Sequence, residues 1–345
     1  MTLMWEEIHE QPQVLENCRK ANAEVIRKAV EEIKARDVQS VVIAARGTSD
    51  HAAIYGKYLF ETLLGIPVVL AAPSVVTVYG GNLKLKNSLV IGISQSGKAG
   101  DAAEIIRAGN ECGAVTLTIT NYVDSPLATL SGYHLHCTAG DEKSVAATKT
   151  FTAQMYLLAM LAAELAGDAS LKEKLGRVPQ AVSEVFGLAD AIEEMVKRYR
   201  FMKECFVLAR GFNYPIAMES ALKIQETSYI RAKAFATSDF YHGPMAMIEK
   251  DMPVIVFAPK GPSLKDVTEM ITKLKESGAD LLVISDSEDA CAMGNCALRI
   301  PETESDFTSV YVNAAVAQMF ACKLSLLRGL NPDEPRMLRK VTITR

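Results

Sequence analysis

Residues 89–101 have the sequence LVIGISQSGKAGD, which changes from apolar to polar within a few positions. The apolar, β-branched run at its start predicts a buried strand of a parallel sheet. The amphipathic segment from Asp101 to Cys112 predicts a helix directly after it. A strand, a tight polar turn and a helix form the place where open α/β sheets bind ligands. The Ser94 and Ser96 hydroxyls, the Gln95 amide and the free N–H groups at the helix start suit an anion, most simply a phosphate. An ordinary turn with a capping serine explains the same residues, so this stretch alone leaves both interpretations open.

The composition is that of an ordinary globular protein. The chain has 345 residues, enough for about two domains. Its hydrophobic content of 49% and charged content of 23% fit a sizeable core. A formal net charge of -4 with no basic block argues against nucleic acid and against an anionic membrane surface. The apolar runs are interrupted and too short to span a bilayer, and the first residues do not resemble a signal peptide.

The cysteines and histidines do not indicate a metal site. The seven cysteines form no CxxC motif and no paired framework, which favours buried free thiols and a cytoplasmic location. Cys291 and Cys296 have no neighbouring His or Cys that would complete a metal site. His134 and His136 share one side of a predicted strand, yet no third ligand is evident.

Apolar runs and helical periods alternate along the chain. Predicted strands lie at 40–45, 68–72, 88–94, 115–120, 134–137, 205–209, 252–258, 280–285 and 298–300. Predicted helices lie at 4–34 (with a break near Pro12), 52–64, 101–112, 150–165, 218–228 and 310–327. The turn Ala-Arg-Gly follows a strand twice, at 45–47 and 209–211. This alternation predicts an α/β protein with two copies of one doubly wound, parallel-sheet unit and flanking helices. The expected segments are N-terminal helices at 1–36, α/β domains at 37–165 and 199–330, a helical connection at 166–198 and a tail at 331–345.

The first half collects glycine and hydroxyl residues at strand ends. They lie at 47–49, 94–96 and 144–148, with 46–50 expected as a polar turn. Capping alone explains any one of these clusters, but three clusters at one sheet edge favour a shared polar pocket. The basic residues of the tail could cover such a pocket if it holds an anion.

The second half carries the candidate acid–base groups. Lys223 and Glu226 share one face of a predicted helix, and their spacing alone favours a surface ion pair. His242 lies in a loop before Gly-Pro and is suited to proton transfer near neutral pH, with His51 as its competitor.

These motifs together resemble the SIS (sugar isomerase) family over nearly the whole chain. The resemblance is to the isomerase half of glucosamine-6-phosphate synthase, and more closely to stand-alone amino-sugar-phosphate deaminases and deglycases. The residues that carry it lie at 7–12, 46–49, 93–97, 145–149, 221–228, 242–244, 331–336 and 340.

The resemblance implies a role for each matching residue. It implies that the substrate and its phosphate are held by Gly47, Thr48, Ser49, Ser94, Gln95, Ser96, Val145 and Ala147. Glu226 matches the base that moves a proton between C1 and C2 of the open-chain sugar, and Lys223 matches a lysine near it. His242 matches the ring-opening group, which reaches the site from the partner subunit of a homodimer. Lys340 matches a tail lysine that meets the sugar carbonyl. No cofactor is implied.

The sequence departs from the synthase pattern in four places. The matching part begins at residue 1 and Thr2 follows Met1, so we expect that this chain does not take nitrogen from glutamine. Ala99 and Ala147 replace a threonine and a serine of the synthase motifs, and residues 72–77 lack its Glu and Arg.

These changes favour a deaminase that converts an amino-sugar 6-phosphate, such as glucosamine 6-phosphate, to the ketose phosphate and ammonia. One alternative is a deglycase for fructosamine-type 6-phosphates, such as those of fructoselysine or glucoselysine. The other is a sugar-phosphate sensor without catalysis.

Overall fold

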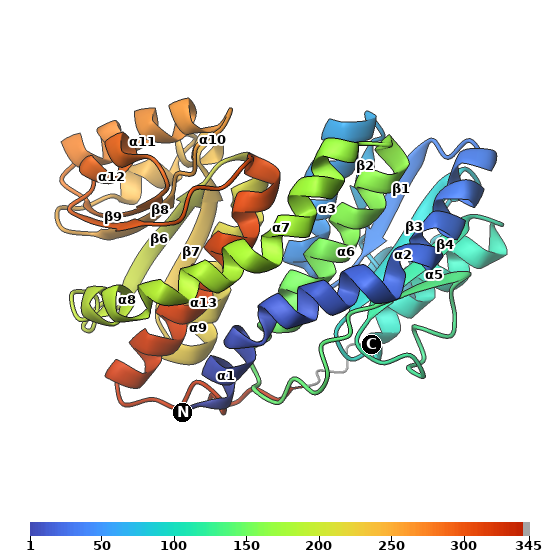
Figure 1. The fold of residues 1–345 in the computed structure, drawn as a ribbon, viewed down its shortest axis with the longest axis horizontal. Coiled ribbons are helices and arrows are strands. Elements are labelled where there is room, and N and C mark those ends of the chain that lie inside the picture. Colours follow the sequence, from blue (N-terminus) through green and yellow to red (C-terminus); the bar gives the residue numbers. More distant parts are fainter. Residues whose placement is uncertain (341–345) are drawn as a thin grey trace. The chain divides into compact units, whose positions relative to one another are not determined.

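The computed structural model describes residues 1–340 and divides into two compact units (Figure 1). The N-sheet unit contains Glu10–Glu142, Ala147–Pro179, Arg339 and Lys340. The C-sheet unit contains Met1–His9, Lys143–Ala146 and Gln180–Leu338. Residues 341–345, the end of the predicted tail, lie outside the described residues.

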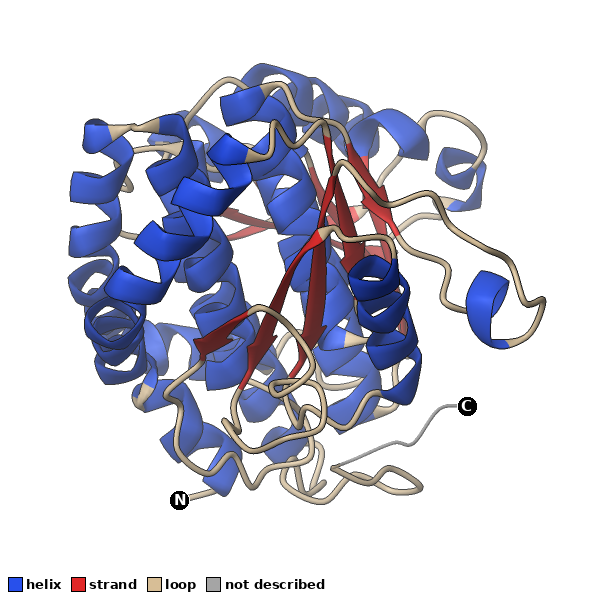
Figure 2. Ribbon diagram, turned by 90° about the vertical axis from the view of Figure 1, so that its right-hand side faces the viewer, coloured by secondary structure: helices blue, strands red, loops and turns tan. Residues whose placement is uncertain are grey.

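The N-sheet unit is built on five parallel strands in the order β2-β1-β3-β4-β5. They are β1 (Ser40–Ala44), β2 (Val68–Leu70), β3 (Ser88–Ser94), β4 (Val115–Thr120) and β5 (Tyr133–His136). Figure 2 draws the strands of the protein in red and its helices in blue. All seven residues of the central strand β3 are buried, as expected for a strand with helices on both faces. The strand predicted from the opening stretch is therefore confirmed.

Helices cover both faces of this sheet. They are α2 (Gln11–Ala35), α3 (Thr48–Leu64), α4 (Ser74–Thr77), α5 (Gly100–Glu111), α6 (Lys149–Ala166) and the first part of α7 (Ala169–Val185). The α5 residues Ile105 and Ile106 share a core with Val42 and Val90. On the other face of β1, Ile43 lies near Gly56 of α3, and α6 packs against α2 and α3. The unit is thus doubly wound.

The C-sheet unit repeats the same topology. Its parallel strands are β6 (Glu204–Ala209), β7 (Arg231–Ala236), β8 (Pro253–Phe257), β9 (Asp280–Ser285) and β10 (Cys296–Arg299). Their order, β7-β6-β8-β9-β10, is that of the first sheet with each strand number raised by five. The prediction of two copies of one α/β unit is therefore confirmed.

The helices of the C-sheet unit include several that the sequence pattern missed. They are α1 (Leu3–His9), α8 (Ala189–Val196), α9 (Tyr214–Ser228), α10 (Thr237–Phe240), α11 (Leu264–Glu276), α12 (Glu288–Ala292) and α13 (Asp306–Leu327), with 3-10 turns η1 (Phe186–Leu188), η2 (Gly211–Asn213) and η3 (Pro244–Met247). Strand β7 and helices α11 and α12 were not predicted. The N-terminal helices predicted as one segment are divided, with α1 in this unit and α2 in the other.

Among residues 1–340, α13 is the one helix with the length and apolar character of a membrane-spanning segment. However, 83% of its most apolar window is buried inside the protein, where α13 packs against α9. Its apolar composition is therefore that of a core helix.

The seven cysteines are all free. Cys18, Cys137, Cys205 and Cys322 are buried, and burial raises the pKa of the Cys18 and Cys205 thiols to about 12. Cys112, expected in an apolar context, is only partly buried. The buried thiols are therefore poor nucleophiles at neutral pH.

Candidate functional site

A tight loop joins the end of β3 at Ser94 to the start of α5 at Gly100. Its turn requires Gly97, which has a positive φ of 65° and where a Cβ would lie 2.0 Å from the Ser125 hydroxyl. The Ser94 hydroxyl accepts a hydrogen bond from the Gly97 N–H at 3.2 Å, and the Ser96 hydroxyl accepts one from the Lys98 N–H at 3.3 Å. Because both hydroxyls act as acceptors within the loop, their protons remain available for other partners.

A cavity of about 340 Å³ opens beside this loop. It lies at the carboxyl ends of β3 and β4 and is lined by Gln95, Ser96, Lys98, Tyr122, Asp124, Ser125, Pro126, Glu142 and Lys340. This is the edge at which open parallel sheets bind ligands. The two ammonium groups, three hydroxyls and one amide among these side chains suit a small anion.

Glu142 anchors the tail at this cavity. Its carboxylate is fully buried and accepts a hydrogen bond from the Lys340 ammonium at 2.7 Å. It also accepts the Thr148 and Thr150 N–H groups at 2.9 and 3.1 Å and the Thr150 hydroxyl at 2.8 Å. Burial alone would raise the pKa of Glu142, but the Lys340 charge and these hydrogen bonds hold it below its ordinary value. Sequence analysis missed Glu142, although it directly precedes the predicted 144–148 cluster.

The other predicted binding residues do not all reach this cavity. Ser94 is buried. Thr48 and Ser49 are the first residues of α3 and Gly47 is its N-cap residue, which corrects the expected polar turn at 46–50. Val145 belongs to the C-sheet unit, where its N–H donates to the Asp333 carbonyl at 3.1 Å, whereas Ala147 belongs to the N-sheet unit. The structure therefore places only Gln95 and Ser96 of the predicted binding residues on the cavity wall, together with Lys340.

The tail residues also differ from one another. Lys340 lines the cavity, whereas the Arg336 guanidinium stacks on the Tyr229 ring of the C-sheet unit with its central carbon 4.1 Å from the ring centre. Of the basic tail residues up to position 340, Lys340 is thus the one that lines the cavity.

Two acid–base candidates of the C-sheet unit, Lys223 and Glu226, form a trio on α9 with Glu219. The Lys223 ammonium is fully buried and lies 2.5 Å from the Glu226 carboxylate and 3.2 Å from that of Glu219. Burial would lower the pKa of Lys223, but the two carboxylates hold it above its ordinary value. The expected surface ion pair is therefore wrong, because the helix face that carries these residues is covered by the core.

Within this trio only Glu226 reaches solvent. Its side chain is 22% exposed, compared with 1% for Glu219 and 0% for Lys223. Glu226 is thus the carboxylate that a ligand can contact. Sequence analysis missed Glu219, although its i, i+4 spacing to Lys223 is a signal that could have found it.

The histidines fall into different environments. His242 is exposed in the loop after α10, and within residues 1–340 its ring has no hydrogen-bond or ion-pair partner. His51, its competitor, lies in the first part of α3. The His134 ring bonds the Thr120 hydroxyl at 2.9 Å, and burial followed by the neighbouring His136 charge lowers the pKa of His134 to about 4. No group of three or more His, Cys, Asp or Glu in the described part of the chain is placed to hold a metal ion.

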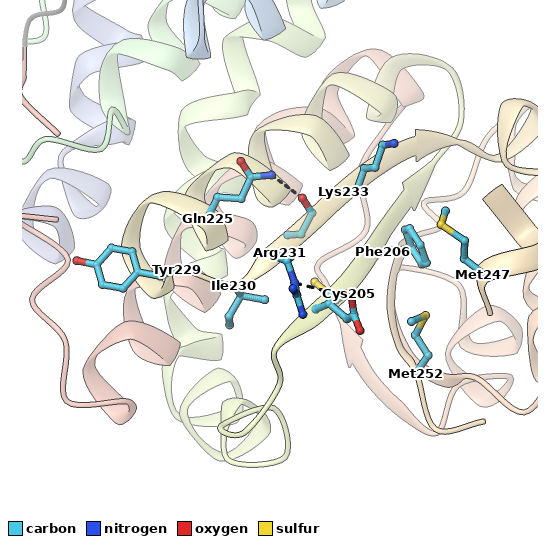
Figure 3. A pocket seen from close by; sticks show the side chains of 11 residues that line it. Cys205, Phe206, Gln225, Tyr229, Ile230, Arg231, Lys233, Met247 and Met252 are labelled. Carbon is cyan, nitrogen blue, oxygen red and sulfur yellow. Dashed lines mark hydrogen bonds and ion pairs between the residues drawn. The ribbon is translucent and has the colours of Figure 1, made fainter. Parts of the chain in front are cut away.

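A larger cavity of about 660 Å³ lies in the C-sheet unit, at the first residues of β6 and β7 (Figure 3). Its lining includes Phe206, Met247 and Met252, and none of the predicted site residues. The Arg231 guanidinium at this cavity lies 3.9 Å from the Glu204 carboxylate. Because this cavity is mainly apolar and lies at the amino ends of the strands, it suits a small anion less well than the smaller cavity does.

Comparisons with known proteins agree with the tandem architecture. The family described as "SIS domain" matches residues 34–164 and 201–328. The glutamine–fructose-6-phosphate aminotransferase (isomerizing) of Thermococcus kodakarensis is 34% identical over 347 residues, which cover 98% of this chain and 57% of that protein. The chain thus spans little more than half the length of this relative.

Two solved structures share the fold. The C-terminal domain of glucosamine-fructose-6-phosphate aminotransferase from Francisella tularensis superimposes with a TM-score of 0.88 at 26% identity, covering 97% of this chain and 98% of that one. Glucosamine-6-phosphate deaminase from Thermotoga maritima superimposes with a TM-score of 0.80 at 22% identity, covering 99% and 100%. The chain therefore belongs to the SIS family and carries two SIS domains in tandem.

Proposed function

We propose that this chain is a phosphosugar isomerase that deaminates an amino-sugar 6-phosphate. The observation that carries the proposal is the α9 trio, in which a buried lysine joins two carboxylates and leaves only Glu226 open to a ligand. A partly exposed carboxylate on a rigid helix is suited to moving a proton between adjacent carbons of an open-chain sugar. The cavity with Gln95, Ser96 and Lys340 would hold the phosphate end.

The proposed reaction converts a hexosamine 6-phosphate and water to a ketohexose 6-phosphate and ammonia. His242, contributed by the partner subunit of a homodimer, would protonate the ring oxygen as the ring opens. Glu226 would then take the proton from C2, giving an enolamine, and deliver a proton to C1, which turns C2 into a ketimine carbon. Water adds to this carbon and ammonia leaves, so that the ketose forms and no cofactor is consumed.

The test is turnover on a panel of sugar phosphates. We expect wild-type protein to release equal amounts of ammonia and fructose 6-phosphate from glucosamine 6-phosphate. Glu226→Gln removes the base but keeps the shape of the side chain, so it should abolish turnover with little change in substrate affinity. Glu249→Gln, at an exposed position of the same unit, serves as the control and should keep full activity.

The panel also includes fructosamine-type 6-phosphates. Release of a free amino acid from these compounds, without ammonia from glucosamine 6-phosphate, would assign the alternative deglycase reaction. Tight binding without turnover of any compound would contradict the enzyme proposal and favour a sensor.

A further inference from the structure

Some of the charged side chains that line the 340 Å³ cavity are paired with an opposite charge and others are not. Lys340 is bound to the buried Glu142 carboxylate at 2.7 Å, so each neutralises the other. Asp124 is exposed and solvated. Lys98 also lines the cavity, and within the described residues its ammonium has no hydrogen bond and no ion pair. Lys98 is therefore the cation on this wall that remains available to a ligand.

The start of α5 does not supply a positive charge for a bound anion. Asp101, buried in its first turn, accepts the Ala102 N–H at 2.9 Å and so places a carboxylate at the positive end of the helix. The Arg46 guanidinium lies 2.9 Å from the same carboxylate, which neutralises it. Ala99, in the N-cap position, has no side-chain donor. An anion bound here thus meets neutral donors at the start of α5, and Lys98 is the lysine of the cavity that has no carboxylate partner among the described residues.

The loop conformation directs Ser96 and Lys98 to the same cavity. The left-handed Gly97 lies between them, and the Lys98 N–H donates to the Ser96 hydroxyl at 3.3 Å. The Ser96 hydroxyl, already an acceptor, can donate its proton to a ligand oxygen. One loop therefore presents a neutral donor and an ammonium to the same cavity, the combination that binds a phosphate dianion.

We propose that Lys98 determines specificity for the phosphate end of the substrate and replaces the hydroxyl that Ala99 lacks. The inference rests on the proposed function and deepens it, because it assigns the counter-charge of the phosphate to one residue. A hydrogen bond to a charged group corresponds to about a 10- to 100-fold change in binding. Because of Lys98, the protein therefore binds phosphorylated sugars more tightly than their unphosphorylated forms.

The test compares Lys98→Gln with Lys98→Arg and with Lys86→Gln, a change at an exposed lysine of the same unit. For glucosamine 6-phosphate, Lys98→Gln should raise KM about 10- to 100-fold and leave kcat within about twofold, because the ammonium binds substrate and transition state alike. Lys98→Arg should keep most of the affinity. Lys98→Gln combined with Ala99→Thr should recover part of it, since threonine restores a hydroxyl donor.

A second measurement separates this inference from the proposed function. Inorganic phosphate should raise the melting temperature of the wild type and of Lys86→Gln, and much less that of Lys98→Gln, whatever the enzyme turns over. Loss of this shift without any turnover in the wild type would support Lys98 and contradict the deaminase. An unchanged KM and an unchanged phosphate shift in Lys98→Gln would overturn the role of Lys98 and leave the proposed function intact.

Discussion

Two lysine–carboxylate clusters place charge in the interior, and for the first of them the spacing of the residues suggested a surface pair. One joins Lys223 to Glu219 and Glu226 on α9, and the other joins Lys340 to Glu142. Burying two opposite charges costs free energy because both lose their water. Their mutual attraction offsets this cost only while both partners are present. Each cluster is therefore sensitive to the loss of one member, and the two give separate predictions.

Lys223→Met should strongly destabilise the C-sheet unit. It leaves the Glu219 carboxylate buried without its cation, a change that costs about 3–5 kcal/mol. Trp5, the single tryptophan, belongs to this unit, so urea unfolding followed by its fluorescence reports the loss directly. Lys197→Met removes an exposed pair with Glu194 and should leave the curve unchanged. Coincident curves for the two variants would show that the trio is not a stabilising unit.

The Glu142 anchor should respond to acid. The pKa of Glu142 is lowered in the folded protein. The stabilising effect of its carboxylate is therefore complete at pH values above its unfolded-state pKa of about 4.3. It is lost as the pH falls through the lower pKa of the folded state. Hydrogen exchange at the Thr148 and Thr150 amides, which donate to this carboxylate, measures the anchor itself.

The two amides should be protected in wild-type protein near pH 6 and lose that protection more steeply than their neighbours as the pH falls below about 4. In Glu142→Gln they should exchange fast at every pH. Glu111→Gln, at an exposed position of the same unit, should behave like the wild type. Equal protection in Glu142→Gln and the wild type would contradict the anchor.

At the scale of elements, the repeat could be predicted but not all of its parts. The buried strands β3, β8 and β9 contain continuous apolar runs, and β4 (VTLTIT) is rich in β-branched residues, so their patterns identify them. β7 was missed because its sequence, RAKAFA, alternates alanine with Arg, Lys and Phe, and alanine favours helices outside a sheet context. α11 is strongly amphipathic but was not identified as a helix from its pattern.

The site was predicted where its residues lie close together in the sequence. The Ser-Gln-Ser-Gly turn was found because strand, turn and helix are contiguous. The Lys340–Glu142 bond joins residues 198 positions apart, and no local pattern predicts such a contact. Burial of Lys223 depends on what covers α9, which spacing alone does not reveal.

The two copies of the strand–turn–helix element differ at the turn. In the first copy this is the Ser-Gln-Ser-Gly turn between β3 and α5. In the second copy, the turn between β8 and α11 already holds a carboxylate. The Lys260 N–H donates to Asp286 at 2.6 Å, and the Thr303 N–H donates to the same side chain at 3.3 Å. Gly261 lies against a second carboxylate, Asp306. An anion from solution would meet two fixed negative charges at this turn.

We therefore expect one phosphate site per chain, in the N-sheet unit. Titration calorimetry with glucosamine 6-phosphate on Glu226→Gln, which should bind without turnover, should give a stoichiometry near one. Ser96→Ala should weaken this binding, whereas Ser263→Ala, at the equivalent turn of the second copy, should not. A stoichiometry near two would show that the second turn also binds.

At the scale of the whole molecule, the chain passes between its two units five times. Short segments from three distant parts of the sequence complete the C-sheet unit: Met1–His9, Lys143–Ala146 and the tail up to Leu338. The Glu7 carboxylate of α1 accepts the N–H groups of Lys143 and Ser144, the latter at 3.3 Å. These contacts hold the segment that contains Val145 in place from the beginning of the chain.

Asp333 ties the beginning of the chain to its tail. Its carboxylate accepts the Leu3 and Met4 N–H groups at 2.9 and 2.8 Å, and its carbonyl accepts the Val145 N–H at 3.1 Å. The first N–H groups of a helix have no partner within the helix, so this aspartate does for α1 what a capping residue usually does. Asp333→Ala should remove the side-chain bonds and keep the backbone one.

We expect Asp333→Ala to lower the free energy of unfolding by about 1 kcal/mol, the usual effect of a lost helix cap. The loss should appear in Trp5 fluorescence, because Trp5 lies in the first turns of α1, where its ring contacts Lys323. Glu334→Ala is the matched control, since Glu334 is the exposed neighbour of Asp333 and should leave the unfolding curve unchanged. If both variants unfold at the same urea concentration, the Asp333 contacts carry no stability, and α1 is held by its packing against α13 and by the Glu7 hydrogen bonds.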